Sequence, residues 1–192
     1  MRKILSFALA GVVLTSLLVS CKKKDSDPGE KIITGYGELT VGSKTYVLSG
    51  GYVKRGGGGT TSGFVNNELC FFSEGLRINS QTGAFTSGEG QIINFALRCH
   101  TSGIINYDAP HYAFSTLPIP NTFGQSSLYY ERLVGGPYPT GSRLVTGGTV
   151  KVESHERGYN VTFNCTGDGG AITGYFVGDL VNVTGVPEQG EE

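Results

Sequence analysis

The sequence predicts an all-β protein, an antiparallel β-sandwich of about eight to ten strands. After an apolar run at the N-terminus, no stretch shows sustained apolar periodicity of 3.6 residues. Short stretches rich in Val, Phe, Tyr and Thr alternate instead between apolar and polar residues, as half-buried strands do. Glycine is abundant, at 31 residues, but lacks the three-residue period of collagen. A closed or half-closed β-barrel is the main alternative, because alternation along strands is common to both architectures.

The first two strands are predicted to form a hairpin. Residues Gly35–Val41 and Lys44–Leu48 flank a two-residue loop that begins with Gly42. Glycine at the first loop position suits a type II′ turn, which fixes the register of the strands. That register places Leu39 opposite Tyr46, on a face that is apolar along both strands.

The middle of the chain is less regular. Residues Phe64–Phe72 read as a strand, but apolar residues occur at both parities and no buried face can be assigned. Residues Gln91–Cys99 alternate cleanly and predict a strand with one apolar face. Residues 100–143 contain five prolines, which predict short strands and long loops, with Tyr112–Phe114 and Ser127–Arg132 as strand pieces.

The last third of the chain predicts a three-stranded antiparallel meander over Gly148–Ser154, Tyr159–Thr166 and Ala171–Val181. One face of these strands is apolar or small and the other is polar, as expected for a sheet with one buried side. A four-residue loop after Ser154 would set the register. In that register Phe163 lies over Gly174, an aromatic ring covering a strand glycine.

The N-terminus has the organisation of a secretory signal peptide. Met1-Arg2-Lys3 is a positive tip, and Ile4–Val19 carries no charge. This apolar run is shorter than the ~20 residues that a membrane-spanning helix needs. It ends in Leu18-Val19-Ser20-Cys21, which resembles the lipobox of bacterial lipoprotein signal peptides. The resemblance implies cleavage before Cys21 and attachment of lipid to its sulfur, so that the membrane is the first expected partner. Several acyl chains on one residue give stable anchoring.

The C-K-K-K-D start and the closing pattern G-T-V-K-V…Y-N-V-T-F…I-T-G-Y-F-V-G-D-L resemble small Bacteroidota lipoproteins of unassigned function. The resemblance implies an outer-membrane location, which the absence of Asp after the lipidated cysteine also favours. The periplasmic and surface-facing orientations both stay open. The resemblance supplies no catalytic residue. The expected organisation is a signal peptide over 1–20, the lipidated cysteine with a tether over 21–34, a β domain over 35–185 and an acidic tail over 186–192.

Net charge and cysteine content limit the possible partners and disulfides. The formal net charge is −1 and no Lys/Arg stripe occurs, which argues against nucleic acid as a partner. Three cysteines remain after Cys21, namely Cys70, Cys99 and Cys165. They form either one disulfide with one thiol left over or three buried free thiols, and spacing does not choose among the pairings.

No metal or cofactor site is predicted. Cys99, His100, Asp108 and His111 fit no standard zinc spacing. A triad hydrolase needs a nucleophile, a base and an orienting acid, and the chain has three histidines and no G-x-S-x-G. The sequence therefore indicates a protein that is not an enzyme, with a hydrolase as the least favoured alternative.

The favoured interpretation is a non-catalytic, membrane-anchored lipoprotein with a binding or accessory role in the cell envelope. The alternative is a module that binds a glycan or another small molecule through loops 100–143, since binding residues concentrate on loops. The expected partner is accordingly an envelope protein or a glycan. A competing interpretation is that the tyrosines of this segment pack the loops onto the sheets. They are Tyr107, Tyr112, Tyr129, Tyr130 and Tyr138.

Overall fold

The computed structural model describes residues 29–56, 63–100, 104–105, 111–124, 127–132 and 140–184. These residues form strands, turns and connecting segments, and none of them is helical. The all-β prediction is confirmed. The part of the chain that is described holds no helix long and apolar enough to cross a membrane. The predicted signal peptide 1–20, Cys21 and the tail 186–192 lie outside the described residues.

The described residues form fourteen strands, more than predicted, because several strands are only two or three residues long. In chain order they are β1 (Gly35–Val41), β2 (Lys44–Leu48), β3 (Gly50–Arg55), β4 (Val65–Phe72), β5 (Arg77–Ile78), β6 (Phe85–Ser87), β7 (Gly90–Cys99), β8 (His111–Phe114), β9 (Thr122–Phe123), β10 (Leu128–Arg132), β11 (Thr140–His155), β12 (Gly158–Gly167), β13 (Gly170–Gly178) and β14 (Val181–Val183).

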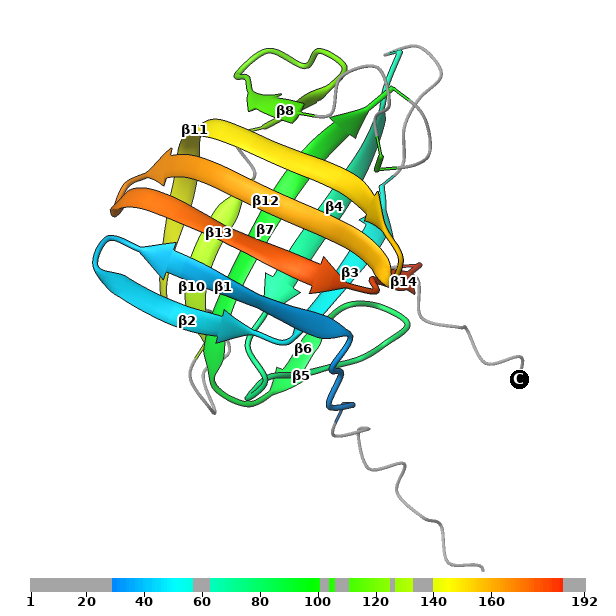
Figure 1. The fold of residues 1–192 in the computed structure, drawn as a ribbon, viewed down its shortest axis with the longest axis vertical. Helices are drawn as coiled ribbons and strands as arrows, with labels where there is room; N and C mark the ends of the chain where they lie inside the picture. Colours follow the sequence, from blue (N-terminus) through cyan, green and yellow to red (C-terminus); the bar gives the residue numbers. More distant parts are fainter. Residues whose placement is uncertain are drawn as a thin grey trace, which may run out of the picture.

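Twelve of these strands belong to one curled sheet. Its order is β14-β3-β4-β7-β9-β8-β11-β12-β13-β1-β2, and β10 pairs with both β7 and β11. Figure 1 shows β11, β12, β13, β1 and β2 in front of a layer made by β3, β4 and β7. Hydrogen bonds through β10 join the two layers, so the half-closed barrel is the architecture present. The sheet is mixed rather than purely antiparallel, since β14 runs parallel to β3 and β8 parallel to β9.

The chain crosses from one layer to the other at Ser49, between β2 and β3. The backbone N–H of Ser49 donates to the carbonyl oxygen of Phe72 at 3.0 Å. Its own carbonyl oxygen accepts from the N–H groups of Thr34 and Gly35 at 3.0 and 3.3 Å. These bonds satisfy the backbone at a corner where ladder pairing stops, and they close one side of the half-barrel.

The main core fills the space between the two layers. Its centre is aromatic: the ring of Phe71 lies 4.8 Å from that of Phe176, and the ring of Phe95 lies 5.4 Å from that of Phe163, measured between centroids. These rings come from both layers and are buried. Aromatic contacts of this kind add to the stabilisation from buried area, so they hold the layers together.

A second apolar cluster lies on the opposite face of β3 and β4. It contains Tyr52, Cys70, Phe72, Leu76, Ile78, Ile92 and Val183. The small sheet of β5 and β6 contributes part of this cluster and is tied to the N-terminal segment by a bridge between Glu30 and Ile78. Both faces of β4 are therefore buried. This explains why its sequence has apolar residues at both parities and predicted no single buried face.

The predicted N-terminal hairpin is confirmed. Leu39 pairs with Tyr46, and Gly42 has φ of +61° at the first loop position. On the outer face, the hydroxyl oxygens of Thr40 and Thr45 lie 3.0 Å apart, within hydrogen-bond distance.

The predicted C-terminal meander is also confirmed in register. Phe163 pairs with Gly174, and a Cβ on this glycine would lie 2.5 Å from Cζ of the ring. One detail differs: β11 and β12 pair as far as His155 and Gly158, so only two residues are left in the turn. Gly158 has φ of +100°, which suits the glycine that follows a tight hairpin turn.

Cys70, Cys99 and Cys165 are buried free thiols. This matches one of the two alternatives left open by the sequence. Cys70 belongs to the second cluster, whereas Cys99 and Cys165 belong to the main core. Burial raises the pKa of each thiol, that of Cys165 to about 12, so the thiols are neutral at physiological pH.

Candidate functional site

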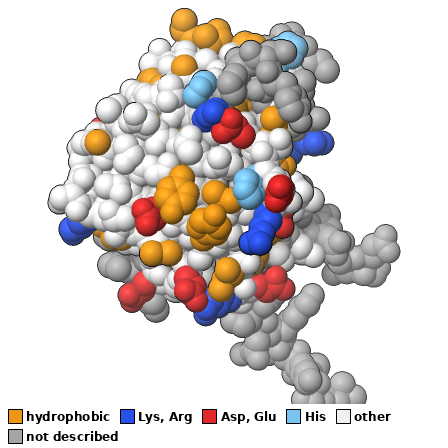
Figure 2. Space-filling model, in the orientation of Figure 1, with side chains coloured by type: hydrophobic (Ala, Val, Ile, Leu, Met, Phe, Trp, Pro, Cys, Tyr) orange, Lys and Arg blue, Asp and Glu red, His pale blue; other side chains and the backbone are white. Residues whose placement is uncertain are grey.

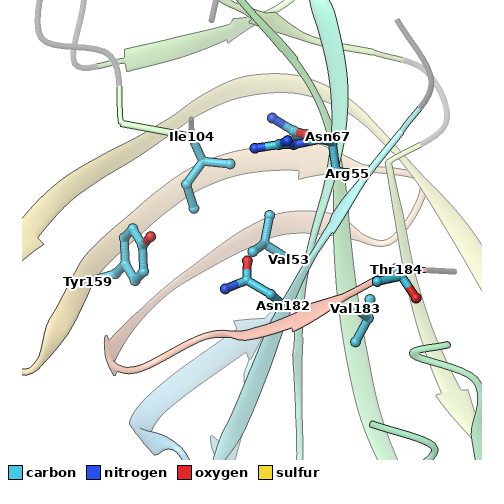
Figure 3. A pocket seen from close by; sticks show the side chains of 8 residues that line it. All are labelled: Val53, Arg55, Asn67, Ile104, Tyr159, Asn182, Val183 and Thr184. Atoms are coloured by element: carbon cyan, nitrogen blue, oxygen red, sulfur yellow. The ribbon is translucent and has the colours of Figure 1, made fainter. Parts of the chain in front are cut away.

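A pocket opens between the two layers at one end of the half-barrel. Its volume is about 630 Å³, within the range of pockets that hold small ligands. Figure 3 shows Tyr159 reaching toward it from β12, with Val53 of β3 and Asn182 of β14 on the other side. Ile104 and Asn67 approach from the side nearest β4 and β7. The pocket is thus bounded by both layers of the sheet.

The inner wall of this pocket is apolar. Val53 and Tyr159 pack against the main core, and Ile104 is buried within it. Ile104 is held in place by its backbone, since its carbonyl oxygen accepts a hydrogen bond from the hydroxyl of Tyr112 at 2.8 Å. An apolar group that entered the pocket would therefore contact side chains that are already fixed by the core.

Asn67 is the polar residue at the inner wall, and its side chain is only half satisfied. It lies at the inward parity of β4, in line with Leu69 and Phe71, and is 2% exposed. Its amide nitrogen donates to Sγ of Cys99 at 3.3 Å, a weak acceptor. Its carbonyl oxygen, Oδ1, is buried and has no hydrogen-bond partner among the described residues. Such an atom costs about 1–3 kcal/mol of stability.

The rim of the pocket is polar and carries positive charge. Arg55 is exposed at the end of β3, and Asn182 is exposed on β14. Arg55 is the one charged side chain among the eight described residues that line the pocket. An apolar floor, one unpaired amide oxygen and a cationic rim together favour an amphipathic ligand over a fully polar one.

A different polar cluster lies outside the barrel, on β3, β4 and β7, and borders a cavity of about 380 Å³. Glu68 accepts hydrogen bonds from the hydroxyl of Tyr52 and the amide of Asn94, both at 2.6 Å. Arg98 donates to the carbonyl oxygens of Ser115 and Leu117. These groups are occupied by one another and by the backbone, so their arrangement is explained by the fold.

For most of the residues predicted from the sequence as site residues, the structure does not describe the side chain. Cys21, Tyr107 and Tyr138 lie outside the described residues, and the side chains of Tyr129 and Tyr130 on β10 are likewise not described. Tyr112 is described and is 1% exposed. It packs in the main core and binds the backbone of Ile104, as the loop-packing interpretation expects, and presents no surface to a ligand.

The described residues include no group of three or more His, Cys, Asp or Glu side chains placed to hold a metal ion. Of the four residues considered from the sequence, Asp108 lies outside the described part of the chain. Cys99 faces the core and contacts Asn67 and Tyr112 instead.

Sequence reasoning missed every residue of the pocket. One signal was present: Asn67 interrupts the inward apolar positions of β4, where a polar residue has to be explained. Its neighbours in the pocket come from parts of the chain far from it in sequence, and no local pattern brings Tyr159 or Asn182 next to it.

Comparison with protein-family models, curated proteins and solved structures found no significant match for this chain.

Proposed function

We propose that this protein is a non-catalytic lipoprotein of the cell envelope whose β domain binds a small amphipathic molecule at the open end of the half-barrel. The observation that carries the proposal is the buried carbonyl oxygen of Asn67, which no described residue partners, in a pocket of about 630 Å³. Ligand sites combine mostly apolar walls with a few placed polar groups, and buried polar atoms without a partner are rare in folded proteins.

The lining indicates the chemistry of the ligand. Its apolar part would contact Val53 and Ile104. A hydroxyl or amine would meet the amide of Asn67, whose two ends exchange by rotation about the last side-chain bond. Arg55 at the rim favours a negative or electron-rich outer group, since charge-assisted hydrogen bonds are about twice as strong as neutral ones.

The location of the protein rests on Cys21. A lipid on this residue would hold the domain at the outer membrane, facing either the periplasm or the cell surface. Only residues 22–28 lie between Cys21 and the first described residue, Gly29. An extended chain spans at most ~3.6 Å per residue. The domain would therefore stay within roughly 30 Å of the lipid surface.

Ligand binding is tested with 1-aminoanthracene, an apolar fluorescent amine, titrated into the purified full chain. We expect saturable fluorescence enhancement, weakened in Val53→Phe because the larger ring occupies the part of the pocket next to its apolar wall. Val47→Phe is the matched control, since Val47 is 68% exposed on the outer face of β2. No saturable binding, or equal binding by Val53→Phe, would contradict the proposed pocket.

Anchoring is tested separately by metabolic labelling with palmitate. Cys21→Ala is expected to abolish labelling and membrane retention, whereas Cys70→Ala, which leaves Cys21 in place, keeps both. Labelling that persists in Cys21→Ala would show that this cysteine is not the lipidated residue.

A further inference from the structure

The outer face of the front layer carries a pair of tyrosines, one exposed and one half-buried. Tyr36 on β1 is 58% exposed, and its ring lies 6.5 Å from that of Tyr175 on β13, at an interplanar angle of 79°. Val177 is the cross-strand neighbour of Tyr36 on the same face. Figure 2 shows hydrophobic side chains gathered on this face, with a histidine, basic side chains and acidic side chains beside them.

The composition of this face makes the pair unusual. The other outward positions of β12 and β13 carry Asn, Thr and Ala, as expected for a surface that meets water. Nothing in the described residues covers the ring of Tyr36. Two adjacent aromatic rings on a strand face with many polar neighbours are a feature of binding surfaces, because an aromatic ring offers a large contact area at a low entropic cost.

A groove of about 650 Å³ begins at Tyr36 and Val177 and runs to the turn between β11 and β12. Its lining includes His155, Glu156 and Arg157 of that turn, and Asp179, just after β13, whose carboxylate lies against Gly158 of the same turn. This groove is distinct from the pocket at the open end of the half-barrel, with which it shares no lining residue.

The backbone shapes the bottom of the groove. Gly158 has φ of +100°, and a Cβ there would lie 2.4 Å from Oδ1 of Asp179. Any other residue would be strained and would collide with the carboxylate, so glycine lets Asp179 lie close above the turn. The N–H of Asp179 is in turn held by the carbonyl oxygen of Thr34 at 2.9 Å.

The polar groups of the groove include both donors and acceptors. Nδ1 of His155 accepts a hydrogen bond from the N–H of Arg157 at 3.2 Å, which leaves Nε2–H of the neutral ring as an outward donor. No hydrogen bond or ion pair with another described residue engages the side-chain groups of Glu156, Arg157 or Asp179.

We propose that this groove binds a saccharide. A sugar ring has an apolar face that can lie against Tyr36, and hydroxyl groups at its edge that both donate and accept. Its hydroxyls would donate to Glu156 and Asp179 and accept from Arg157 and His155, and hydrogen bonds to charged groups are the strong ones. Tyr175, whose ring meets that of Tyr36 at 79°, would hold the ring of Tyr36 in place beneath the sugar.

The mixed charges in the groove favour a ligand that can both donate and accept. The two carboxylates oppose an anionic ligand, and Arg157 offsets part of their attraction for a cationic one. A neutral polyol can use all of these groups at once, because its hydroxyls are both donors and acceptors.

The test is an array of immobilised neutral, sulfated and amino oligosaccharides, probed with the full chain in detergent and followed by titration of the retained sugars. We expect neutral glycans to be retained, with a dissociation constant about tenfold higher for Tyr36→Ala and for Arg157→Ala. Leu117→Ala, an exposed change in the segment between β8 and β9, and Val53→Phe, the pocket variant, should bind as the unsubstituted chain does.

Far-UV spectra and melting curves check that each variant is folded, which surface substitutions at exposed positions should not alter. Three outcomes would overturn the proposal: retention of no neutral glycan, retention of sulfated or amino sugars alone, and glycan binding by Tyr36→Ala that equals that of the unsubstituted chain. Because Val53→Phe changes the pocket and leaves the groove, failure of one proposal is distinguishable from failure of the other.

Discussion

Replacing Asn67 by leucine should stabilise the unliganded protein and weaken ligand binding in the pocket. Leucine has the same branched heavy-atom skeleton as asparagine and no polar atoms. Asn67 is 2% exposed, and its Oδ1 has no partner among the described residues. Removing that oxygen removes its desolvation penalty of about 1–3 kcal/mol. The substitution also removes the weak hydrogen bond from the Asn67 amide to Sγ of Cys99, which is a smaller loss.

We expect a net gain of about 1–2 kcal/mol in the free energy of unfolding. For a domain of this size each kcal/mol raises the melting temperature by about 2–4 °C. Urea unfolding measures the change directly, as a higher midpoint at an unchanged slope. Asn66→Leu is the matched control, since Asn66 precedes Asn67 on β4 and is exposed, and its effect should stay within about 0.5 kcal/mol.

The prediction has two readouts that can fail separately. If Asn67→Leu lowered the stability by about 1 kcal/mol or more, Oδ1 would have to be hydrogen-bonded in solution, and the unpaired-oxygen argument would fall. If the variant were more stable but bound 1-aminoanthracene as tightly as before, the amide would have no part in ligand recognition. A stabilised protein with weakened binding is the combination expected of a residue retained for function at the expense of stability.

Three further predictions concern the core. Gly174→Ala should destabilise by about 1–3 kcal/mol in urea unfolding, because the new Cβ would lie 2.1 Å from the carbonyl oxygen of Glu38 and 2.5 Å from Cζ of Phe163; no loss would mean that both strand and ring shift freely. The thiols of Cys70, Cys99 and Cys165 should react with a disulfide reagent more than about a hundredfold faster in urea than in the folded protein, since buried thiols react only from open states. Burial raises the pKa of the Cys165 thiol from 9.0 to about 12, so the unfolded chain loses the thiol proton at a lower pH than the folded protein does. The free energy of unfolding should therefore fall as the pH rises between these two values. The fall should be less steep in Cys165→Ala.

The elements that sequence reasoning predicted correctly are those whose partners are close in the chain. The hairpin of β1 and β2 follows from a glycine at the first loop position and alternation on either side. The meander of β11, β12 and β13 follows in the same way, down to Phe163 over Gly174. In each case the turn determines the register, and the apolar face then has one possible orientation.

Where partners are distant, the same reasoning failed. The strand β14 pairs in parallel with β3, although some 130 residues separate them, and no local pattern records that contact. The two buried faces of β4 depend on β5 and β6, strands of two and three residues that the sequence did not predict. Asn67 likewise donates to Cys99 of β7 and shares its pocket with Tyr159 of β12, groupings that arise only once the sheet has curled.

The start of β12 contributes to both proposed sites, and its geometry keeps them separable. Arg157 belongs to the turn that walls the outer groove, whereas Tyr159, at the inward parity with Val161, lines the pocket within the barrel. Gly158 lies between them with a φ that excludes other residues, so the turn cannot change without moving both neighbours. Substitutions at Gly158 would therefore report on both sites together. Arg157→Ala changes the groove and Val53→Phe the pocket, and they are the pair that assigns an observed ligand to one site or the other.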